Sequence, residues 1–349
     1  MTDPVIKPNP AYKRIATEEA FAPPEMLKMY LDLYESRSLD DPGFDSLWGF
    51  YLTSMAPRPR LIREKLADMD ALRIADMDAS GIDHQILSLT SPGVQVFQRD
   101  IAVSLARDSN DFLHDAIRRH PTRFSGLAAI APQAPELAAQ ELERCVKMGF
   151  KGIINNSHTF GEYLSDKKFW PIFEAAEAMD MPIYIHPYTP PKNMIAPMLE
   201  AGLDGAIFGF GVETGMHLLR IITAGVFDRF PKLNIIVGHM GEALPYWMYR
   251  LDYMHAAGVR AGRYECMKPL KKKVSDYMRD NVYITNSGMA WEPAIKFAQQ
   301  VIGADRVMYA MDYPYQYTPQ EVVDMDNMDM DLATKKKFYQ EVAEKVFKL

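Results

Sequence analysis

The sequence predicts an α/β protein, a single (β/α)8 TIM barrel, and three observations lead to this fold class. Eight short apolar segments recur along the 349 residues, and helix-like stretches with apolar residues three or four positions apart lie between them. This alternation implies parallel strands joined by right-handed crossovers. Three of the segments also run directly into a histidine or an aspartate, and active sites are built at the carboxyl ends of barrel strands. We therefore expect a closed barrel rather than an open sheet.

The predicted strands are short apolar runs, as expected of parallel strands that are buried on both faces. They cover residues 14–18, 85–90, 124–131, 152–157, 182–186, 234–239, 282–286 and 306–312. Residues 135–143 and 169–179 have helical spacing, and the capping-box pattern that begins at Thr318 predicts a long terminal helix. The acidic stretch 324–329 is expected to be a solvated face of that helix.

The region from about residue 21 to residue 60 does not have the barrel pattern. It combines prolines with large apolar side chains, among them Trp48, Phe50, Tyr51 and Met55. We interpret this region as an inserted segment that covers the barrel mouth, within one domain that spans residues 1–349.

The composition argues against several classes of partner. A net charge of −7 disfavours binding to nucleic acid, and no apolar run approaches the length of a membrane span. The first residues lack the pattern of a signal peptide, and the two cysteines, Cys145 and Cys266, match a reducing compartment. We expect a cytoplasmic protein with neither a nucleic-acid nor a membrane partner.

The candidate metal ligands lie at the ends of predicted strands. His186, His239 and Asp312 follow the fifth, sixth and eighth strands, and Glu18 and Glu19 end the first. Only one of two adjacent residues on a strand can face inward, so the other glutamate is expected to be structural. Two carboxylates and one imidazole favour Mn²⁺ or Mg²⁺ over zinc. Three protein ligands would leave positions open for substrate or water.

Less specific roles compete with this interpretation. A single histidine at a strand end is about as often a hydrogen-bonded loop residue as a ligand, and Asp312 could cap a turn before Pro314. Their joint occurrence on regularly spaced strands is what favours a metal site. No lysine ends a strand, which disfavours a Schiff-base enzyme. His158 is a weaker candidate for lining the site, and the remaining histidines are expected to be structural.

Several phrases of the sequence, taken together, resemble one enzyme family over nearly the whole chain. They include ATEEAF, LWGFY, RIADMDASGID, YIHP, GHMGEALPYWMYRLDYM and VMYAMDYPYQY. This combination resembles the amidohydrolase superfamily and, within it, the decarboxylase branch. The resemblance implies a metal-dependent enzyme that removes CO₂ from an ortho-hydroxy aromatic acid without oxidation. It points most specifically to conversion of 5-carboxyvanillate to vanillate in the catabolism of lignin-derived aromatic compounds.

The resemblance also implies roles for individual residues. Glu18, His186 and Asp312 would bind the metal, and Asp312 would also donate a proton, assisted by His239. Ala20 stands where the wider family often has a second imidazole, which favours manganese over zinc. Substrate contacts are implied for Tyr51, Arg58, Arg250 and Tyr315, with Arg250 reaching a neighbouring subunit's site in a homodimer or larger homo-oligomer.

Two other functions remain compatible with these residues. The same barrel and metal could activate water to hydrolyse a lactone or an amide, with His239 as the base. Hydrolysis consumes water whereas decarboxylation releases CO₂, so the products distinguish the two reactions. A binding protein without activity is disfavoured, because several metal-binding and acid–base groups end strands at one face of the barrel.

Overall fold

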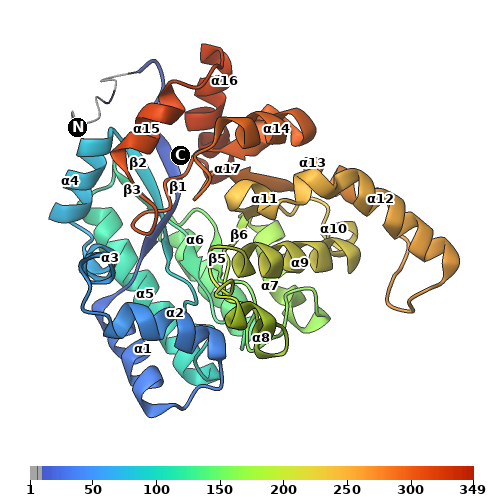
Figure 1. Ribbon diagram of the computed structural model, residues 1–349, viewed down its shortest axis with the longest axis horizontal. Helices are drawn as coiled ribbons and strands as arrows, with labels where there is room; N and C mark the ends of the chain where they lie inside the picture. Colours follow the sequence, from blue (N-terminus) through green and yellow to red (C-terminus); the bar gives the residue numbers. More distant parts are fainter. Residues whose placement is uncertain (1–5, 7–9) are drawn as a thin grey trace.

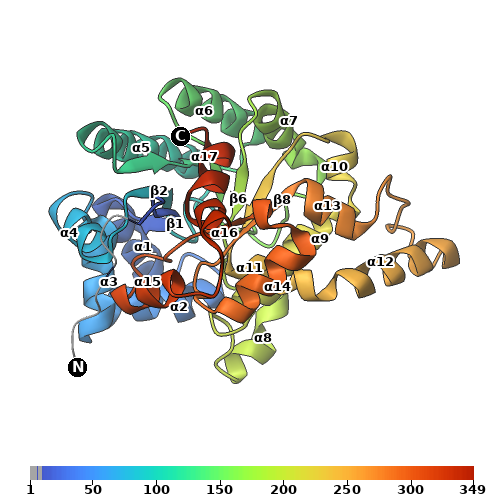
Figure 2. The ribbon, with the colours of Figure 1, turned by 90° about the horizontal axis from the view of Figure 1, so that it is seen from above.

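The computed structural model describes residue 6 and residues 10–349, with helices arranged around parallel strands (Figures 1 and 2). Three strands form one sheet, in the order β1 (Ile15–Phe21), β2 (His84–Leu89) and β3 (Phe124–Gly126). Six strands form a second sheet, in the order β4 (Ala128–Ala129), β5 (Ile153–Asn155), β6 (Ile183–Ile185), β7 (Ile235–Val237), β8 (Val282–Thr285) and β9 (Val307–Met308). All neighbouring strands pair in parallel.

Backbone hydrogen bonds join the two sheets at both of their seams. β3 and β4 are one strand position interrupted at Leu127, whose N–H donates to the Leu87 carbonyl at 2.9 Å. At the other seam, the Thr17 N–H donates to the Tyr309 carbonyl at 3.1 Å. Nine strands therefore occupy eight positions around a (β/α)8 TIM barrel, and each position falls within or overlaps one of the eight predicted segments. The prediction of the fold class is confirmed.

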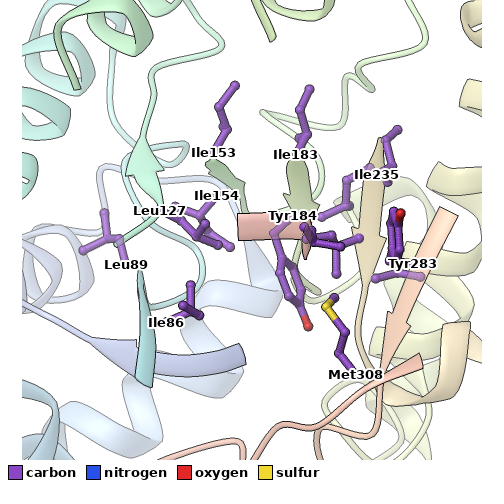
Figure 3. Close-up of a cluster of buried hydrophobic side chains, with 14 of the residues drawn as sticks. Ile86, Leu89, Leu127, Ile153, Ile154, Ile183, Tyr184, Ile235, Tyr283 and Met308 are labelled. Atoms are coloured by element: carbon purple, nitrogen blue, oxygen red, sulfur yellow. The ribbon is translucent and has the colours of Figure 1, made fainter. Parts of the chain in front are cut away.

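The barrel core consists of apolar side chains from nearly every strand. β5, β6 and β7 read Ile-Ile-Asn, Ile-Tyr-Ile and Ile-Ile-Val, and every one of these residues is buried. Apart from Asn155, these are the continuous apolar runs that a parallel strand covered on both faces requires. Figure 3 shows the cluster that they form with side chains of the other strands, including Ile86, Tyr283 and Met308.

Four helices separate β1 from β2, where the sequence predicted an insert. They are α1 (Pro24–Ser36), α2 (Pro42–Thr53), α3 (Pro57–Ala67) and α4 (Ala71–Ser80). Proline opens the first three, where its missing N–H has no helical partner to lose. The segment is tied to loops that follow strands: the Trp48 indole N–H donates to the Ser91 carbonyl at 3.0 Å, and the Tyr188 hydroxyl donates to Asp41 at 2.7 Å. α2 therefore packs over the carboxyl ends of the strands.

The remaining helices complete the barrel wall and its loops. They are α5 (Arg99–Arg119), α6 (Pro135–Lys147), α7 (Trp170–Ala178), α8 (Lys192–Glu200), α9 (Gly209–Thr223), α10 (Val226–Arg229), α11 (His239–Glu242), α12 (Leu244–Ala261), α13 (Val274–Asp280), α14 (Glu292–Ile302), α15 (Pro319–Asp326), α16 (Leu332–Lys336) and α17 (Val342–Phe347). Single turns of tighter or wider helix lie at Lys167–Phe169, Ala304–Arg306 and Lys337–Glu341. Among the described residues, no helix combines the length and the apolar character that crossing a membrane would need.

Two predictions about the ends of elements are wrong. β1 continues to Phe21, which pairs with Leu89, so Glu18 and Glu19 lie inside the strand and not at its end. The Thr318 side chain accepts from the Glu321 N–H as the capping pattern predicted, but α15 spans only Pro319–Asp326.

The acidic stretch 324–329 is a solvated face only in part: Asp324, Asn327 and Asp329 are exposed, but Asp326 is not. Asp326 is buried and forms an ion pair with Arg14, with Nη2 and Oδ2 2.5 Å apart. Its partner lies 312 positions earlier in the chain, and no local pattern signals such a pairing.

Candidate active site

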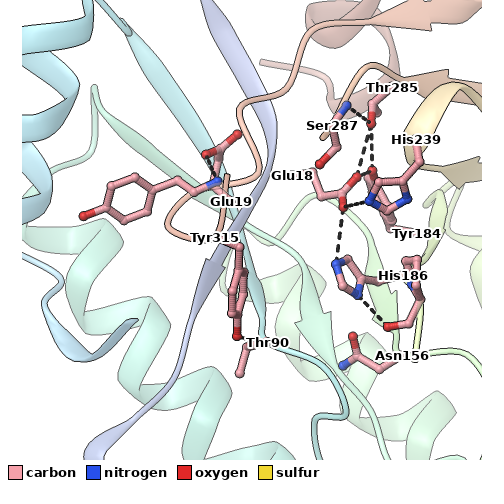
Figure 4. A network of polar contacts seen from close by, with 12 residues as sticks. Glu18, Glu19, Thr90, Asn156, Tyr184, His186, His239, Thr285, Ser287 and Tyr315 are labelled. Atoms are coloured by element: carbon pink, nitrogen blue, oxygen red, sulfur yellow. Dashed lines mark hydrogen bonds and ion pairs between the residues drawn. The ribbon is translucent and has the colours of Figure 1, made fainter. Parts of the chain in front are cut away.

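Glu18 is the centre of a buried polar network on the inner side of β1 (Figure 4). One carboxylate oxygen, Oε2, accepts hydrogen bonds from the Tyr184 hydroxyl and, at 3.2 Å, from the Thr285 hydroxyl. The other oxygen, Oε1, is buried and finds no hydrogen-bond partner among the described residues. An unpaired buried acceptor is costly, so this oxygen is a candidate ligand for a cation.

Gly238, the last residue before His239, has no side chain, and the Glu18 carboxylate occupies the space that a side chain would need. A Cβ atom at residue 238 would lie 2.4 Å from Glu18 Oε2, which is closer than non-bonded atoms approach. The glycine ahead of the histidine is therefore a steric requirement of the glutamate on β1.

Two imidazole rings face the free oxygen of Glu18. Nε2 of His186 lies 3.3 Å from Glu18 Oε1, and Nε2 of His239 lies 3.6 Å from the same atom. Nδ1 of His186 lies 2.9 Å from the Pro187 carbonyl oxygen, which can only accept. The hydrogen of a neutral His186 therefore sits on Nδ1, and Nε2 keeps its lone pair for a ligand.

The Glu242 carboxylate fixes the orientation of the His239 ring. Its Nδ1 donates to Glu242 Oε1 at 2.7 Å, so that Nε2 points toward Glu18. Although burial disfavours the charged ring, Glu242 and Glu18 raise the pKa of His239 to about 10. Burial alone would raise the pKa of Glu18, but His239 and His186 lower it. The His239 ring and the Glu18 carboxylate thus stabilise each other's charges.

Asp312 approaches this group from the loop after β9. Its side-chain oxygen and the His239 ring both border Gly288, where an added Cβ would lie 3.5 Å from Asp312 Oδ2 and 3.3 Å from His239 Cδ2. Burial, together with the charge of Glu18, raises the pKa of Asp312 to about 7. A carboxyl with this pKa can hold a proton near neutral pH.

Asp312 and His239 also share an uncommon backbone conformation. Their φ angles are 59° and 49°, in the left-handed region that side-chain-bearing residues seldom adopt. Strain of this kind persists only where surrounding contacts hold it, and it clusters at functional sites.

The four side chains suit a divalent ion in their chemistry, although they do not yet form a coordination cage. Within residues 6 and 10–349, no three His, Cys, Asp or Glu side chains are placed so that they could hold an ion as they stand. The unpaired Oε1 of Glu18 nevertheless faces the free Nε2 of His186. Two acceptors in this arrangement repel unless a proton or a cation lies between them. Ligation would require the side chains to close in on the ion.

Three of the four predicted substrate contacts lie beside this cluster. The Tyr315 N–H donates to the Asp312 carbonyl at 2.8 Å, and the Tyr315 hydroxyl pairs with the Thr90 hydroxyl at 2.6 Å. The rings of Tyr51 and Tyr315 meet edge to face, with centroids 5.6 Å apart. Arg58 is exposed, and its guanidinium donates to the Tyr315 carbonyl at 2.9 Å. The predicted insert therefore contributes Tyr51 and Arg58 to the mouth.

Arg250, the fourth predicted contact, is not brought to the cluster. It is exposed on α12, a helix that projects away from the barrel in Figures 1 and 2. In the described chain, no hydrogen bond, ion pair or ring contact joins Arg250 to the other predicted site residues.

Sequence reasoning missed several residues that shape the site. Glu242 orients His239, and Tyr184 and Thr285 orient Glu18. Glu242 follows a strand-end histidine at the third position, a spacing that could have signalled it. Tyr184 and Thr285 lie within apolar strands, where only the three-dimensional structure identifies their partner.

The chain is similar to one known family and to characterised proteins over most of its length. The family described as Amidohydrolase matches residues 30–349. The chain belongs to the amidohydrolase family. A γ-resorcylate decarboxylase of a Polaromonas species is 37% identical over 347 residues, which cover 96% of this chain and 98% of that relative.

Solved structures of family members are similar over almost the whole chain. A 5-carboxyvanillate decarboxylase from Novosphingobium aromaticivorans, complexed with manganese and 4-hydroxy-3-methoxy-5-nitrobenzoic acid, is 61% identical with a TM-score of 0.95, covering 97% of this chain and 96% of that one. A dihydroxybenzoic acid decarboxylase from Polaromonas, with bound manganese and the inhibitor 2-nitroresorcinol, is 36% identical with a TM-score of 0.83, covering 97% of both chains.

Proposed function

We propose that this protein is a manganese-dependent decarboxylase that converts 5-carboxyvanillate to vanillate and CO₂. The observation that carries the proposal is the meeting of Glu18, His186 and Asp312 at one barrel face, in a chain 61% identical to a 5-carboxyvanillate decarboxylase. The ligand of that neighbour has a nitro group where 5-carboxyvanillate has the carboxylate that is lost. The match to γ-resorcylate decarboxylase supports the broader class, the ortho-hydroxy aromatic acids.

Glu18 through Oε1, His186 through Nε2 and Asp312 through its carboxylate would hold the ion. When bound, Mn²⁺ supplies Lewis acidity toward a phenol oxygen and the carboxylate ortho to it. An oxygen-rich set with a single imidazole suits manganese better than zinc. His239 would stay outside the ligand set, because Glu242 and Glu18 raise its pKa to about 10 and a protonated ring has no lone pair at Nε2. Its Nε2 also lies farther from Glu18 than that of His186.

The residues of the chain explain how CO₂ could leave. Direct loss of CO₂ would place an unstable carbanion on the ring, so a proton must reach the ring carbon first. Asp312, whose pKa is raised to about 7, would donate that proton to the carbon that bears the carboxylate. The carbon–carbon bond then breaks, its electron pair returns to the ring, and CO₂ departs. The His239–Glu242 pair would assist by setting the protonation state of Asp312.

Residues at the mouth would select the substrate. Arg58 presents a planar guanidinium that can bind the second carboxylate through two hydrogen bonds. Tyr51 and Tyr315 offer ring faces for packing and hydroxyl groups for hydrogen bonding. Burial raises the pKa of both tyrosines, so both remain protonated donors.

We further propose a homodimer or larger homo-oligomer in which α12 takes part. Tyr246, Tyr249 and Tyr253 on this helix are 76%, 85% and 60% exposed, and a large exposed apolar patch marks an interaction surface. Arg250 lies among them and would contact a neighbouring subunit's site. We also propose a cytoplasmic location and a role in the catabolism of lignin-derived aromatic compounds.

The test is to incubate the purified, manganese-loaded protein with a panel of ortho-hydroxybenzoates. We expect CO₂ and vanillate from 5-carboxyvanillate, loss of activity after chelation, and recovery on adding Mn²⁺ but less on adding Zn²⁺. His186→Ala should lose bound metal, measured by elemental analysis. Full metal content in this variant would exclude His186 as a ligand. Hydrolysis of lactones or amides without release of CO₂ would overturn the proposal.

A further inference from the structure

Asp312 is held in its left-handed conformation by a residue on the far side of β1. Glu19 is fully buried, and its two carboxylate oxygens accept from the two peptide N–H groups that flank Asp312. Oε1 accepts from Met311 at 2.8 Å, and Oε2 accepts from Tyr313 at 3.2 Å. Since a carboxylate is an acceptor at both oxygens, it satisfies both donors at once.

Glu18 and Glu19 point to opposite sides of β1, as successive residues of a strand do (Figure 4). Glu18 faces His186 and His239, whereas Glu19 faces the loop that presents Asp312. A backbone hydrogen bond strengthens the same junction, because the Ala20 N–H donates to the Tyr313 carbonyl at 2.7 Å. One strand therefore sets the position of two candidate metal ligands.

We propose that Glu19 is a positioning residue that fixes the backbone at Asp312, so that the Asp312 carboxyl reaches the same site as Glu18. This inference rests on the proposed function, because it takes Asp312 as a metal ligand and proton donor. Glu19 touches neither the metal nor the substrate in this scheme. It acts through the peptide groups on both sides of Asp312.

Arg73 compensates the buried carboxylate and supports the same turn. It is fully buried, lies over the Tyr313 ring at 4.6 Å, and donates to the Ala20 carbonyl at 2.7 Å. A buried charge is tolerated when an opposite charge and hydrogen bonds accompany it. Burial raises the pKa of Glu19, whereas the two N–H donors and the Arg73 charge oppose that rise.

The competing interpretation is that Glu19 only fastens β1 to the chain after β9. Thr17 provides a matched control, because it is buried on the same strand and at the same seam. Its hydroxyl donates to the Tyr309 carbonyl at 2.7 Å, three residues before Asp312. Thr17→Val removes this bond with little change in size, so it weakens the seam without touching the turn at Asp312.

The experiment compares Glu19→Gln with Thr17→Val in three measurements. These are amide hydrogen exchange in the metal-free protein, Mn²⁺ affinity, and the denaturant midpoint. The glutamine places an NH₂ group against one of the two N–H donors. We expect faster exchange at Met311 or Tyr313 and a loss of roughly 10–100-fold in Mn²⁺ affinity, the usual effect of removing a residue that orients a ligand. Thr17→Val should lower the midpoint and leave the Mn²⁺ affinity unchanged.

The double variant shows whether Glu19 acts through Asp312. If it does, Glu19→Gln adds no further loss of affinity in an Asp312→Ala background. Equal losses of Mn²⁺ affinity in Glu19→Gln and Thr17→Val would overturn the positioning role, as would unchanged exchange at Met311 and Tyr313. Should Glu19→Gln not fold, Glu19→Asp keeps both acceptors with a shorter reach, and a smaller change in the same direction is expected.

Failure of the proposed function would look different. If Asp312→Ala alone left the Mn²⁺ affinity intact, Asp312 would not be a ligand. Amide exchange at Met311 and Tyr313 would then still decide whether Glu19 holds the turn.

Discussion

Two buried charged residues of the β1 segment, Arg14 just before the strand and Glu18 within it, have opposite surroundings. Just before the strand, Arg14 pairs with Asp326 at 2.5 Å, and both side chains are almost completely buried. Tyr12 donates to the same carboxylate at 3.0 Å, and Arg14 donates to the Gly81 carbonyl at 3.0 Å. Within the strand, Glu18 has one oxygen bonded and one left without a hydrogen bond to any described residue.

This difference indicates that the Arg14–Asp326 pair stabilises the fold, whereas the group around Glu18 is available to bind a ligand. Hydrogen bonds around the Arg14–Asp326 pair use its polar atoms within the protein, so this end of the barrel closes on itself. At the carboxyl end, charged atoms of Glu18, His186 and His239 face one another and leave room for a ligand. Barrel enzymes commonly divide stability and activity between these two faces. Substitutions at the two ends should therefore have separable effects.

The largest effect on chemistry is expected from Asp312→Asn. Asparagine keeps the shape and an oxygen that can bind metal, but it has no proton to donate. We expect kcat to fall by about 10²–10⁴-fold, while Mn²⁺ and substrate still bind and the unfolding midpoint changes little. The variant should also fail to exchange deuterium into vanillate at the carboxylation carbon. Normal turnover with metal bound would assign the proton to His239 or to water instead.

The opposite pattern is expected from Asp326→Asn. Removing one partner leaves the Arg14 charge buried and uncompensated, which should lower the free energy of unfolding by about 3–5 kcal/mol. Chemical denaturation measures this loss, and kcat of the folded protein should not change. Asp40→Asn is the control, because the Lys192–Asp40 pair has the same 2.5 Å distance but is largely exposed, and it should have little effect. Similar losses in both variants would show that burial of the pair does not matter.

The sequence predicted the parts of the site that local patterns determine. His186, His239 and Asp312 were found because each follows an apolar strand. Glu242, Tyr184 and Thr285 were missed, because their importance comes from contacts with side chains on other elements.

Other parts of the fold depended on pairings between distant segments. The eight strand positions were predictable, because parallel strands covered on both sides must be continuously apolar. Because its neighbours are acidic, Asp326 was predicted to be exposed to solvent. It is buried instead, in an ion pair with Arg14 near the other end of the chain. Glu19 was expected to be structural, but its hydrogen bonds on both sides of Asp312 could not be read from sequence.

A smaller effect is expected at the cover of the mouth. Arg58→Ala removes a charged contact to a substrate carboxylate, which should cost roughly 1.5–3 kcal/mol, on the order of ten- to a hundredfold in kcat/KM. Arg60→Ala is a matched control, since this residue is an exposed arginine on the same helix. Steady-state kinetics on 5-carboxyvanillate measures kcat/KM of both variants. Equal kinetics in both variants would make Arg58 an ordinary surface residue.

The last prediction concerns Glu213, a buried carboxyl that belongs neither to the Arg14–Asp326 pair nor to the group around Glu18. It lies on α9, whose Gly211 and Gly215 closely approach Glu242, the residue that anchors His239. Thr214 donates to Glu213 Oε2 at 3.3 Å, whereas Oε1 lacks a hydrogen-bond partner in the part of the chain that the structure describes. Burial raises the pKa of Glu213 to about 8.

This raised pKa should make the stability depend on pH. In the unfolded chain a glutamate titrates near about 4.3, so between roughly pH 4.5 and 8 the folded state binds more protons than the unfolded state. The free energy of unfolding therefore decreases as the pH rises through this window, by up to about 1.4 kcal/mol per pH unit. Because the raised pKa of Asp312 adds a slope of the same sign, Glu213→Gln should reduce the slope by the Glu213 share, whereas Glu136→Gln, at an exposed position, should leave it unchanged. Denaturant unfolding across the window measures both, and an identical slope in the parent and in Glu213→Gln would mean that Glu213 stays ionised in the fold.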